Sequence, residues 1–218
     1  YGLELEHMLS PHNLNFLVYN DTLIEEHITG IPGDEFIEKM LPSCTASEKS
    51  QIAKEFVKFN ERCMIRLLGD MRSYNYVIVP THDFDHVVYS IRAIDFDQQC
   101  FEGKFNVYRP QFFKENFKIV DLVSEKFEKM SINQYKLEER SIIAKRLLSY
   151  KNRVERLIKS MIADTISTPE HEALLKAKIF EYTKDPKFLK CKNMGEILKN
   201  ALGFVKRNYE TENTEIVF

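Results

Sequence analysis

Apolar residues between Thr45 and Leu68 recur every three or four positions, a spacing typical of a helix with one buried face. Thr45 and Glu48 have the spacing of a capping box, in which two side chains bond to free amide groups at the start of a helix. Gly69 follows the last apolar position, and glycine is a common helix terminator. The pattern therefore predicts a long amphipathic helix that ends at Leu68.

Shorter apolar runs on both sides of this helix have the composition of β-strands. The stretch LNFLVYNDTLIEEHITG, which starts at Leu14, holds two such runs around the turn dipeptide Asn20-Asp21 and predicts a β-hairpin. Residues 76–79 and 87–94 are rich in β-branched and aromatic residues and predict a second hairpin, with its turn near residues 83–86. The first half of the chain is therefore expected to mix strands with helices.

Helices dominate the remainder. A short opening helix ends before Ser10-Pro11, because proline disfavours helical geometry in the residue that precedes it. Ser131 with Gln134, and Thr168 with Pro169, have the spacing of helix starts. The fold class is therefore α+β. We expect helices over residues 116–130, 132–163, 169–183 and 193–209, the second of them broken, and a loose tail over residues 211–218.

Composition narrows the partners of the protein. The chain of 218 residues has a formal net charge of −2, which gives no overall positive field, so we expect no nucleic-acid partner. No apolar run approaches the length of a membrane span and no signal peptide is visible, which predicts a cytoplasmic protein without a membrane partner. The four cysteines are scattered and indicate buried thiols. The chain opens without Met inside the expected first helix, as a fragment or the ordered part of a longer protein would.

The second hairpin brings three polar residues together at its base. Asp70 and Asn75 lie in the loop before the first strand, and antiparallel pairing places Asn75 opposite the region of Asp95. The tripeptide Asp-Phe-Asp occurs twice, at residues 83–85 and 95–97, but the first copy lies at the tip, more than roughly 13 Å from the base. A single metal site cannot use both copies, and we expect chemistry at the base.

The residue types at the base suit phosphoryl transfer. This reaction needs hard oxygen ligands for magnesium, and a further carboxylate that orients or deprotonates the acceptor hydroxyl. We expect Asp70 to be this catalytic carboxylate, and Asn75 and Asp95 to be magnesium ligands, with Asp97 assisting at a second ion. ATP and magnesium would then be the cofactors.

These residues also carry a resemblance. GDMRSYN followed by AIDFD resembles the catalytic and metal-binding loops of the protein-kinase-like superfamily, especially its aminoglycoside and choline phosphotransferase branch. The resemblance implies a kinase-like fold, with residues 1–30 as the remnant of an N-terminal lobe and residues 31–210 as a helical C-terminal lobe with a catalytic hairpin. It also implies a hinge at Glu26, His27 and Ile28 that meets adenine. The acceptor would be a hydroxyl of a small molecule or a protein.

The sequence departs from the family pattern in two ways. Leu68 stands where the family has a histidine, and the glycine-rich loop and strand lysine that hold the phosphates have no counterpart. Either these parts precede residue 1, or the chain is a catalytically weakened relative. Glu4 or Glu6 could pair with such a lysine, but an ordinary surface glutamate is the favoured interpretation. Two alternatives thus remain: a catalytically inactive kinase-like interaction module, and an unrelated helical interaction protein.

Three further segments could be functional sites, but a structural interpretation is preferred for each. We interpret the tip residues His82, Asp83, Asp85 and His86 as a solvated or substrate-contacting turn rather than a metal site. The aromatic segment 105–117 is expected to anchor a loop to the helical lobe rather than to form a substrate platform. The basic residues of 145–159 are expected to form a solvated helix surface.

Overall fold

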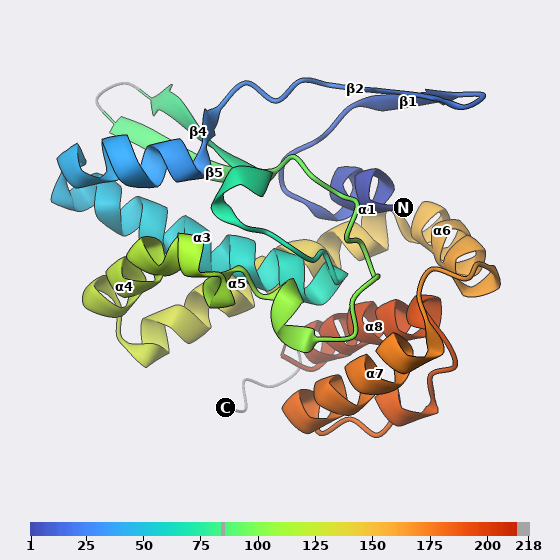
Figure 1. The fold of residues 1–218 in the computed structure, drawn as a ribbon. Helices are drawn as coiled ribbons and strands as arrows, with labels where there is room; N and C mark the ends of the chain where they lie inside the picture. The colour runs from blue at the N-terminus through green and yellow to red at the C-terminus, as the bar shows by residue number, and fades with distance from the viewer. Residues whose placement is uncertain (84–85, 213–218) are drawn as a thin grey trace.

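The computed structural model describes residues 1–83 and 86–212 and shows an α+β fold (Figure 1). Two small antiparallel sheets lie at one side of the molecule, and helices form the rest. The predicted fold class is confirmed at this level. The strands are β1 (Phe16–Tyr19), β2 (Thr22–Glu25), β3 (Ile31–Pro32), β4 (Tyr76–Asp83) and β5 (His86–Ala93). The helices are α1 (Gly2–Leu9), α2 (Gly33–Glu35), α3 (Ala46–Arg66), α4 (Phe117–Lys126), α5 (Lys129–Ser149), α6 (Lys151–Ala163), α7 (Pro169–Thr183) and α8 (Met194–Glu212).

Both predicted hairpins are present. Strands β1 and β2 pair antiparallel around a turn in which Asn20 has a φ of 51°, a left-handed conformation that asparagine tolerates. This hairpin extends along the upper edge of the molecule in Figure 1 and exposes large apolar side chains on both strands. The second sheet has the order β3-β4-β5, with Tyr76 opposite Ala93 and Asp83 opposite His86. The base of this hairpin therefore lies where the sequence places it, and residues 84–85 of the predicted turn lie outside the described range.

Helix α3 begins as predicted and ends earlier than predicted. The backbone amide of Glu48 donates to Thr45 Oγ1 (3.3 Å), and the amide of Thr45 donates to the Glu48 carboxylate (2.8 Å), which completes the capping box. The predicted end at Leu68 is wrong, because Leu67 already adopts a left-handed conformation with a φ of 54°. Leu68 instead lies in the following loop, bridged to Gln99.

The helices of the second half follow the predicted periodicity, with shifted ends. The long segment 132–163 is broken at Tyr150 into α5 and α6, and α7 begins at the predicted cap, where Thr168 accepts from the amide of His171. The predicted cap at Ser131 is wrong, since α5 starts at Lys129 and contains it. Helix α8 continues to Glu212, so the first residues of the expected tail are helical, and residues 213–218 lie outside the described range.

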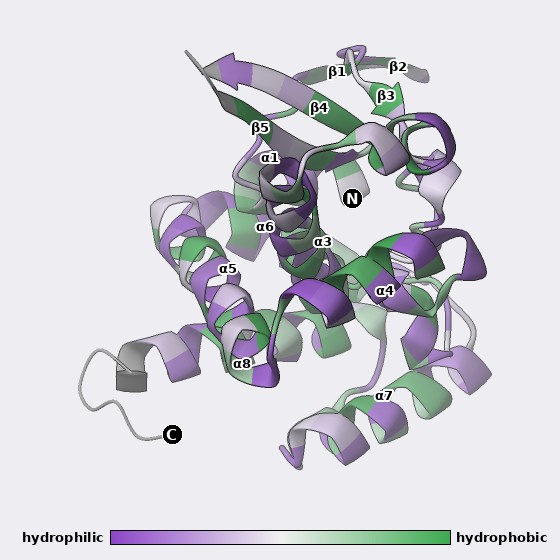
Figure 2. Ribbon diagram, turned by 90° about the vertical axis from the view of Figure 1, so that its left-hand side faces the viewer, coloured by the Kyte–Doolittle hydropathy of each residue, from purple (hydrophilic) through white to green (hydrophobic). Residues whose placement is uncertain are grey.

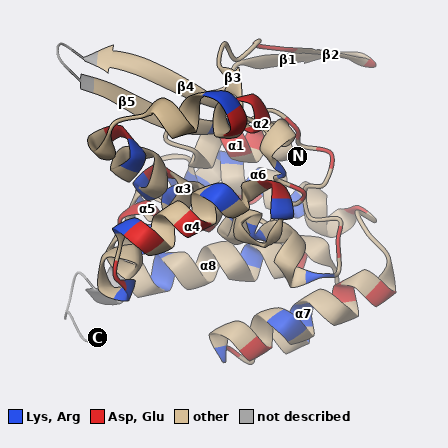
Figure 3. Cartoon of the chain, turned by 60° about the vertical axis from the view of Figure 1, so that its left-hand side comes forward, with Lys and Arg blue, Asp and Glu red and all other residues tan. Residues whose placement is uncertain are grey.

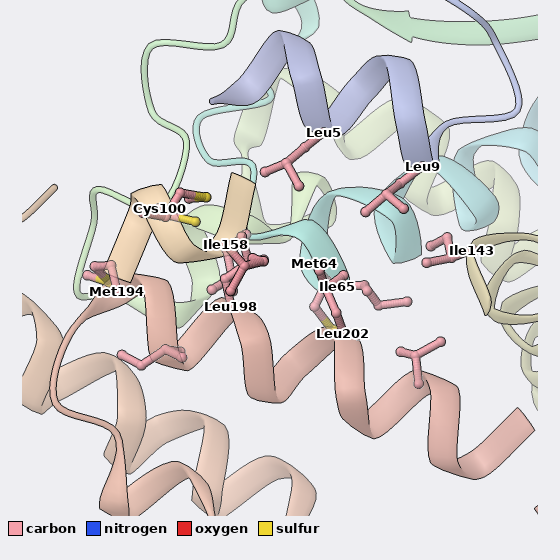
Figure 4. Close-up of a cluster of buried hydrophobic side chains, with 14 of the residues drawn as sticks. Leu5, Leu9, Met64, Ile65, Cys100, Ile143, Ile158, Met194, Leu198 and Leu202 are labelled. Atoms are coloured by element: carbon pink, nitrogen blue, oxygen red, sulfur yellow. The ribbon is translucent and has the colours of Figure 1, made fainter. Parts of the chain in front are cut away.

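Two hydrophobic clusters flank α3. One joins α1, the end of α3 and the C-terminal helices, and the close-up in Figure 4 shows Leu5 and Leu9 of α1 directed toward Met64 and Ile65. The other fills the space between α3, the β3-β4-β5 sheet and α4. The expected boundary at residue 30 therefore does not separate two cores, because α1 shares its core with the C-terminal helices.

The surface is mixed in polarity and in charge. Figure 2 shows hydrophobic and hydrophilic residues alternating along α4 and α7, as helices with one buried face require. Blue and red segments alternate along the same two helices in Figure 3, where basic and acidic residues are coloured. None of the helices within residues 1–83 and 86–212 combines the length and the apolar character that crossing a membrane requires.

Charged residues are also buried, in a network around Arg62 of α3. Arg62 is 1% exposed and donates to Glu55 (2.7 Å) and to the backbone carbonyl of Ile91 in β5 (3.2 Å). It also lies 3.2 Å from the carboxylate of Glu139 in α5. Burial disfavours its charge, but the carboxylates of Glu139 and Glu55 raise the pKa of Arg62 above its usual range. One turn later, Arg66 pairs with Glu6 of α1.

Removing Arg62 should destabilise the protein strongly. We expect Arg62→Ala to lower the free energy of unfolding by about 3–5 kcal/mol, because Glu55 and Glu139 would lose their shared cation inside the protein. Urea denaturation measures this loss. The matched control is Lys54→Ala on the same helix, whose partly exposed ion pair with Glu138 (3.5 Å) is worth less than about 1 kcal/mol. Equal small losses in both variants would contradict the structural role of Arg62.

Candidate functional site

The loop after α3 runs antiparallel to the segment after β5. Three backbone hydrogen bonds join them, two at the start of the loop and one at its end. They are Cys100 N to Leu67 O (2.8 Å), Gly69 N to Gln98 O (3.2 Å) and Ile94 N to Asn75 O (3.1 Å). The Gln99 side chain adds bonds to the carbonyls of Arg66 (2.6 Å) and Leu67 (3.1 Å), which the helix end leaves without an intrahelical partner. The loop of Asp70 and Asn75 is thereby fixed beside Asp95 and Asp97.

Asp70 and Asn75 are in direct contact. The Asn75 amide nitrogen lies 2.8 Å from the backbone oxygen of Asp70 and 3.4 Å from its carboxylate. Asp70 has a φ of 56°, and its amide donates to Val107 O (3.1 Å), which fixes the backbone from a third segment. Within the described residues, Asn75 Oδ1 accepts no hydrogen bond, so this oxygen is available to a cation.

Asp95 and Asp97 occupy a tight turn directly after β5. The amide of Asp97 donates to Asp95 Oδ1 (3.1 Å), which closes the turn. Burial, followed by the negative charges of Asp95 and Asp70, raises the pKa of Asp97. The carboxylates of Asp95 and Asp70 therefore both act on the Asp97 carboxylate, and a divalent cation would relieve this repulsion. An open cavity of about 250 Å³ lies beside this turn and is lined in part by Asp97, Phe96 and Phe101.

A metal site made of protein side chains alone is not present in the described part of the chain. No group of three or more His, Cys, Asp or Glu side chains there could hold a metal ion. Magnesium in phosphoryl-transfer sites is bound by one or two protein ligands together with phosphate oxygens, and the side chains of Asn75 and Asp95 carry oxygen atoms of the kind that it takes. Of the predicted tip residues, Asp85 lies outside the described range, and the side chains of Asp83 and His86 are not described.

The predicted hinge lies between β2 and β3. Glu26 and His27 are exposed, whereas Ile28 is buried together with Leu14 and Val77. Val77 lies two residues after Asn75 in the sequence. The Glu26 carboxylate accepts bonds from the backbone and side-chain amides of Asn15 (3.1 and 2.9 Å). Across residues 1–83 and 86–212, no partner bonds to the backbone groups of His27 or Ile28, which leaves them able to bond a ligand.

The two glutamates of α1 already have partners. Glu6 is 4% exposed and pairs with Arg66, and Glu4 lies 2.7 Å from Arg153 of α6. The favoured interpretation of ordinary surface glutamates is therefore wrong for Glu6. The physical reason is that α1 packs its inner face against α3 and α5, where only a paired carboxylate is stable.

The aromatic segment 105–117 is anchored on two sides. The Phe105 and Tyr182 rings pack with centroids 5.4 Å apart, and the Arg109 guanidinium lies over both rings, as the anchoring interpretation predicts. On the other side, Asn116 donates to the backbone of Met71 (3.0 Å). The segment thus connects α7 with the loop of Asp70.

Two residues that the sequence did not single out, Arg72 and Glu115, are linked to the candidate carboxylate: Arg72 contacts Asp70, and Glu115 contacts Arg72. Arg72 Nε donates to Asp70 Oδ1 (2.9 Å), and Arg72 Nη1 donates to Glu115 Oε1 (3.0 Å). Arg72 stands two positions after Asp70 in the same loop, so their contact could have been expected from the sequence. Glu115 is 43 positions further along, and no local pattern connects it to the loop.

Comparison with family models, with curated proteins and with solved structures gave no match in any of the three. No family is therefore assigned to the chain. What the protein does must be argued from the placement of the residues just described.

Replacing Asp97 should stabilise the metal-free protein. Its raised pKa means that the folded state disfavours the ionised carboxylate. The protein therefore loses stability as the pH rises through the folded pKa of Asp97, and this loss is absent below about pH 3.9, where the carboxylate is protonated in both the folded and the unfolded state. We expect Asp97→Asn to raise the Tm at pH 7 by about 1–2 °C, and the gain to shrink toward pH 4. Asp121→Asn, at an exposed position on α4, is the control. A gain that does not depend on pH would contradict the electrostatic explanation.

Proposed function

We propose that the protein is a magnesium- and ATP-dependent phosphotransferase of the kinase-like type, which transfers a phosphoryl group to a hydroxyl of a small molecule or a protein. The observation that carries this proposal is the contact between Asn75 and Asp70 in a loop that is hydrogen-bonded at both ends to the segment containing Asp95 and Asp97. This arrangement gathers a carboxylate and oxygen ligands on neighbouring loops, as phosphoryl transfer requires.

Each residue has a distinct role in this proposal. Asp70 orients or deprotonates the acceptor hydroxyl, for which its carboxylate lies one third exposed. Asn75 Oδ1 and the Asp95 carboxylate hold magnesium, and Asp97 assists at a second ion. Bound magnesium supplies positive charge to the phosphate oxygens. The backbone groups of His27 and Ile28 meet adenine beside Glu26.

The mechanism depends on position more than on bond-making by the protein. In phosphoryl transfer, most of the rate enhancement comes from holding the reacting groups in line and from neutralising charge. The backbone bonds between the two loops supply such rigidity, since they fix Asp70 and Asn75 relative to the turn of Asp95. A separation of more than about 10 Å among Asp70, Asn75 and Asp95 would favour an unrelated helical protein, and the 3.4 Å contact between Asn75 and the Asp70 carboxylate supports the kinase-like proposal for these two groups.

One observation favours a second candidate, a catalytically inactive kinase-like interaction module. The resemblance implies a glutamate on α1 that pairs with a phosphate-holding lysine, but Glu4 and Glu6 are paired with Arg153 and Arg66. The exposed apolar side chains of β1 and β2 would then suit a protein partner. Calorimetric titration separates the candidates, because the inactive module predicts no binding of ATP with magnesium.

The first functional prediction concerns Asp95. We expect Asp95→Asn to abolish magnesium-dependent binding of a non-hydrolysable ATP analogue, because the strongest anionic ligand of the ion is removed. The Tm should change by less than about 2 °C, since an asparagine oxygen can still accept the bond from the amide of Asp97. Titration calorimetry with and without magnesium measures the effect, and Asp121→Asn is the control. Magnesium-dependent binding at the original strength would refute the ligand assignment.

The second concerns Asp70. We expect Asp70→Asn to lower kcat by about 10²–10⁴-fold, while the KM for ATP stays within about threefold, because the carboxylate acts on the acceptor and not on the nucleotide. Asparagine tolerates the left-handed backbone at this position, so the loop should keep its conformation. ATP hydrolysis measures the effect without knowledge of the acceptor, since water serves as one. An unchanged kcat would remove Asp70 from the chemistry.

A further inference from the structure

Arg72 lies between the candidate catalytic carboxylate and a second carboxylate. Its Nε donates to Asp70 Oδ1 (2.9 Å) and its Nη1 donates to Glu115 Oε1 (3.0 Å). The centre of its guanidinium also lies 5.0 Å from the centroid of the Phe113 ring. Two edges and one face of the planar group are thus in contact, which fixes both its position and its tilt.

Glu115 and Phe113 belong to the anchored segment 105–117. This segment reaches α7 through Phe105, and it is bonded to the Asp70 loop next to Arg72, where the Asn116 side chain donates to Met71 O (3.0 Å). The Glu115 carboxylate is therefore presented by a fixed backbone and not by a free loop. Its second oxygen, Oε2, is shielded from solvent and has no hydrogen-bond partner in the described part of the chain. There the carboxylate is therefore held by Arg72 alone, through Oε1.

A bond from Arg72 to Asp70 alone would hold neither side chain firmly. Arginine has many rotamers, and both side chains are about one third exposed, where water competes for the bond. The contacts with Glu115 and Phe113 restrict the rotamers of Arg72, so that its guanidinium is held in place to bond to Asp70. The orientation of the Asp70 carboxylate therefore depends on a residue that does not touch it.

We infer that Glu115 is a positioning residue for Asp70 and acts through Arg72. This inference rests on the proposed function, since it gives Asp70 the catalytic role. It makes the competence of the site dependent on the placement of segment 105–117. A shift of this segment would release Arg72, and Asp70 would lose the orientation that it needs toward an acceptor hydroxyl.

The alternative is an ordinary surface ion pair, which would change neither rate nor orientation. Three variants separate the two. Glu115→Ala removes the contact, Glu115→Gln keeps its size and an acceptor oxygen, and Glu115→Ala combined with Arg72→Ala tests whether the effect passes through the arginine. Glu125→Ala is the matched control, because this exposed carboxylate bonds to its neighbour Lys126.

We expect Glu115→Ala to lower the kcat of magnesium-dependent ATP hydrolysis about tenfold and to leave the KM for ATP within about twofold. Glu115→Gln should recover most of this loss, and Glu115→Ala should have no further effect in the Arg72→Ala protein. The Tm should stay within about 2 °C in every variant. An unchanged kcat, an effect on KM alone, or a full additional loss in the Arg72→Ala background would each overturn the inference.

A second measurement does not need activity. The Nε–H group of Arg72, assigned in an NMR spectrum by its loss in Arg72→Lys, should exchange slowly with solvent in the original protein, quickly in Glu115→Ala and slowly in Glu115→Gln. If this pattern holds while no variant hydrolyses ATP, the proposed function fails and the coupling of Glu115 to Arg72 stands. Rapid exchange in the original protein would overturn the inference whether or not the protein is active.

Discussion

The fold depends on the placement of two arginine side chains inside the protein, on the central helix α3. Arg62 and Arg66 are each 1% exposed, and their partners come from α1, α3, β5 and α5. A buried guanidinium is tolerated only when carboxylates and carbonyls surround it, so these elements must approach α3 in one arrangement. The two hydrophobic clusters add most of the stabilisation, but apolar contacts are not directional and would allow the helices to slide. The arginines specify the register in which the clusters meet.

The candidate site follows from how α3 ends. Leu67 takes a left-handed conformation, and the Gln99 side chain bonds to the last carbonyls of the helix, so the chain leaves α3 alongside the segment that follows β5. The hairpin then closes the arrangement from the other end, because Asn75 directly precedes β4 and bonds to Ile94 directly after β5. Asp70 is therefore held at both ends of its loop by the same neighbouring segment, and a third contact comes from Val107. Rigidity of this kind is what a reaction that depends on positioning requires.

Local patterns in the sequence predicted the elements well and long-range pairs poorly. The capping box at Thr45, a break within residues 132–163 and the pairing that places Asn75 opposite the region of Asp95 all follow from short stretches of residues, and the structure places the break at Tyr150. The early end of α3 could not be predicted, because leucine rarely adopts the conformation that stops the helix there. The pairing of Glu6 with Arg66, 60 positions apart, and of Arg72 with Glu115, 43 positions apart, depends on tertiary packing that no periodicity encodes. The sequence located the carboxylates and amide of the candidate site, but not the groups that hold them.

The left-handed backbone at Asp70 also limits how this chain can diverge. Asp70 has a φ of 56°. Leu67 and Cys100, which are joined by a backbone hydrogen bond, share this conformation, with φ values of 54° and 56°. β-Branched residues are poorly tolerated there, whereas glycine and asparagine are the least strained replacements for an aspartate. Both replacements remove the carboxylate and leave the loop intact. Under the proposed function, a descendant that lost the phosphotransferase activity but kept the shape of this loop should therefore carry glycine or asparagine at position 70.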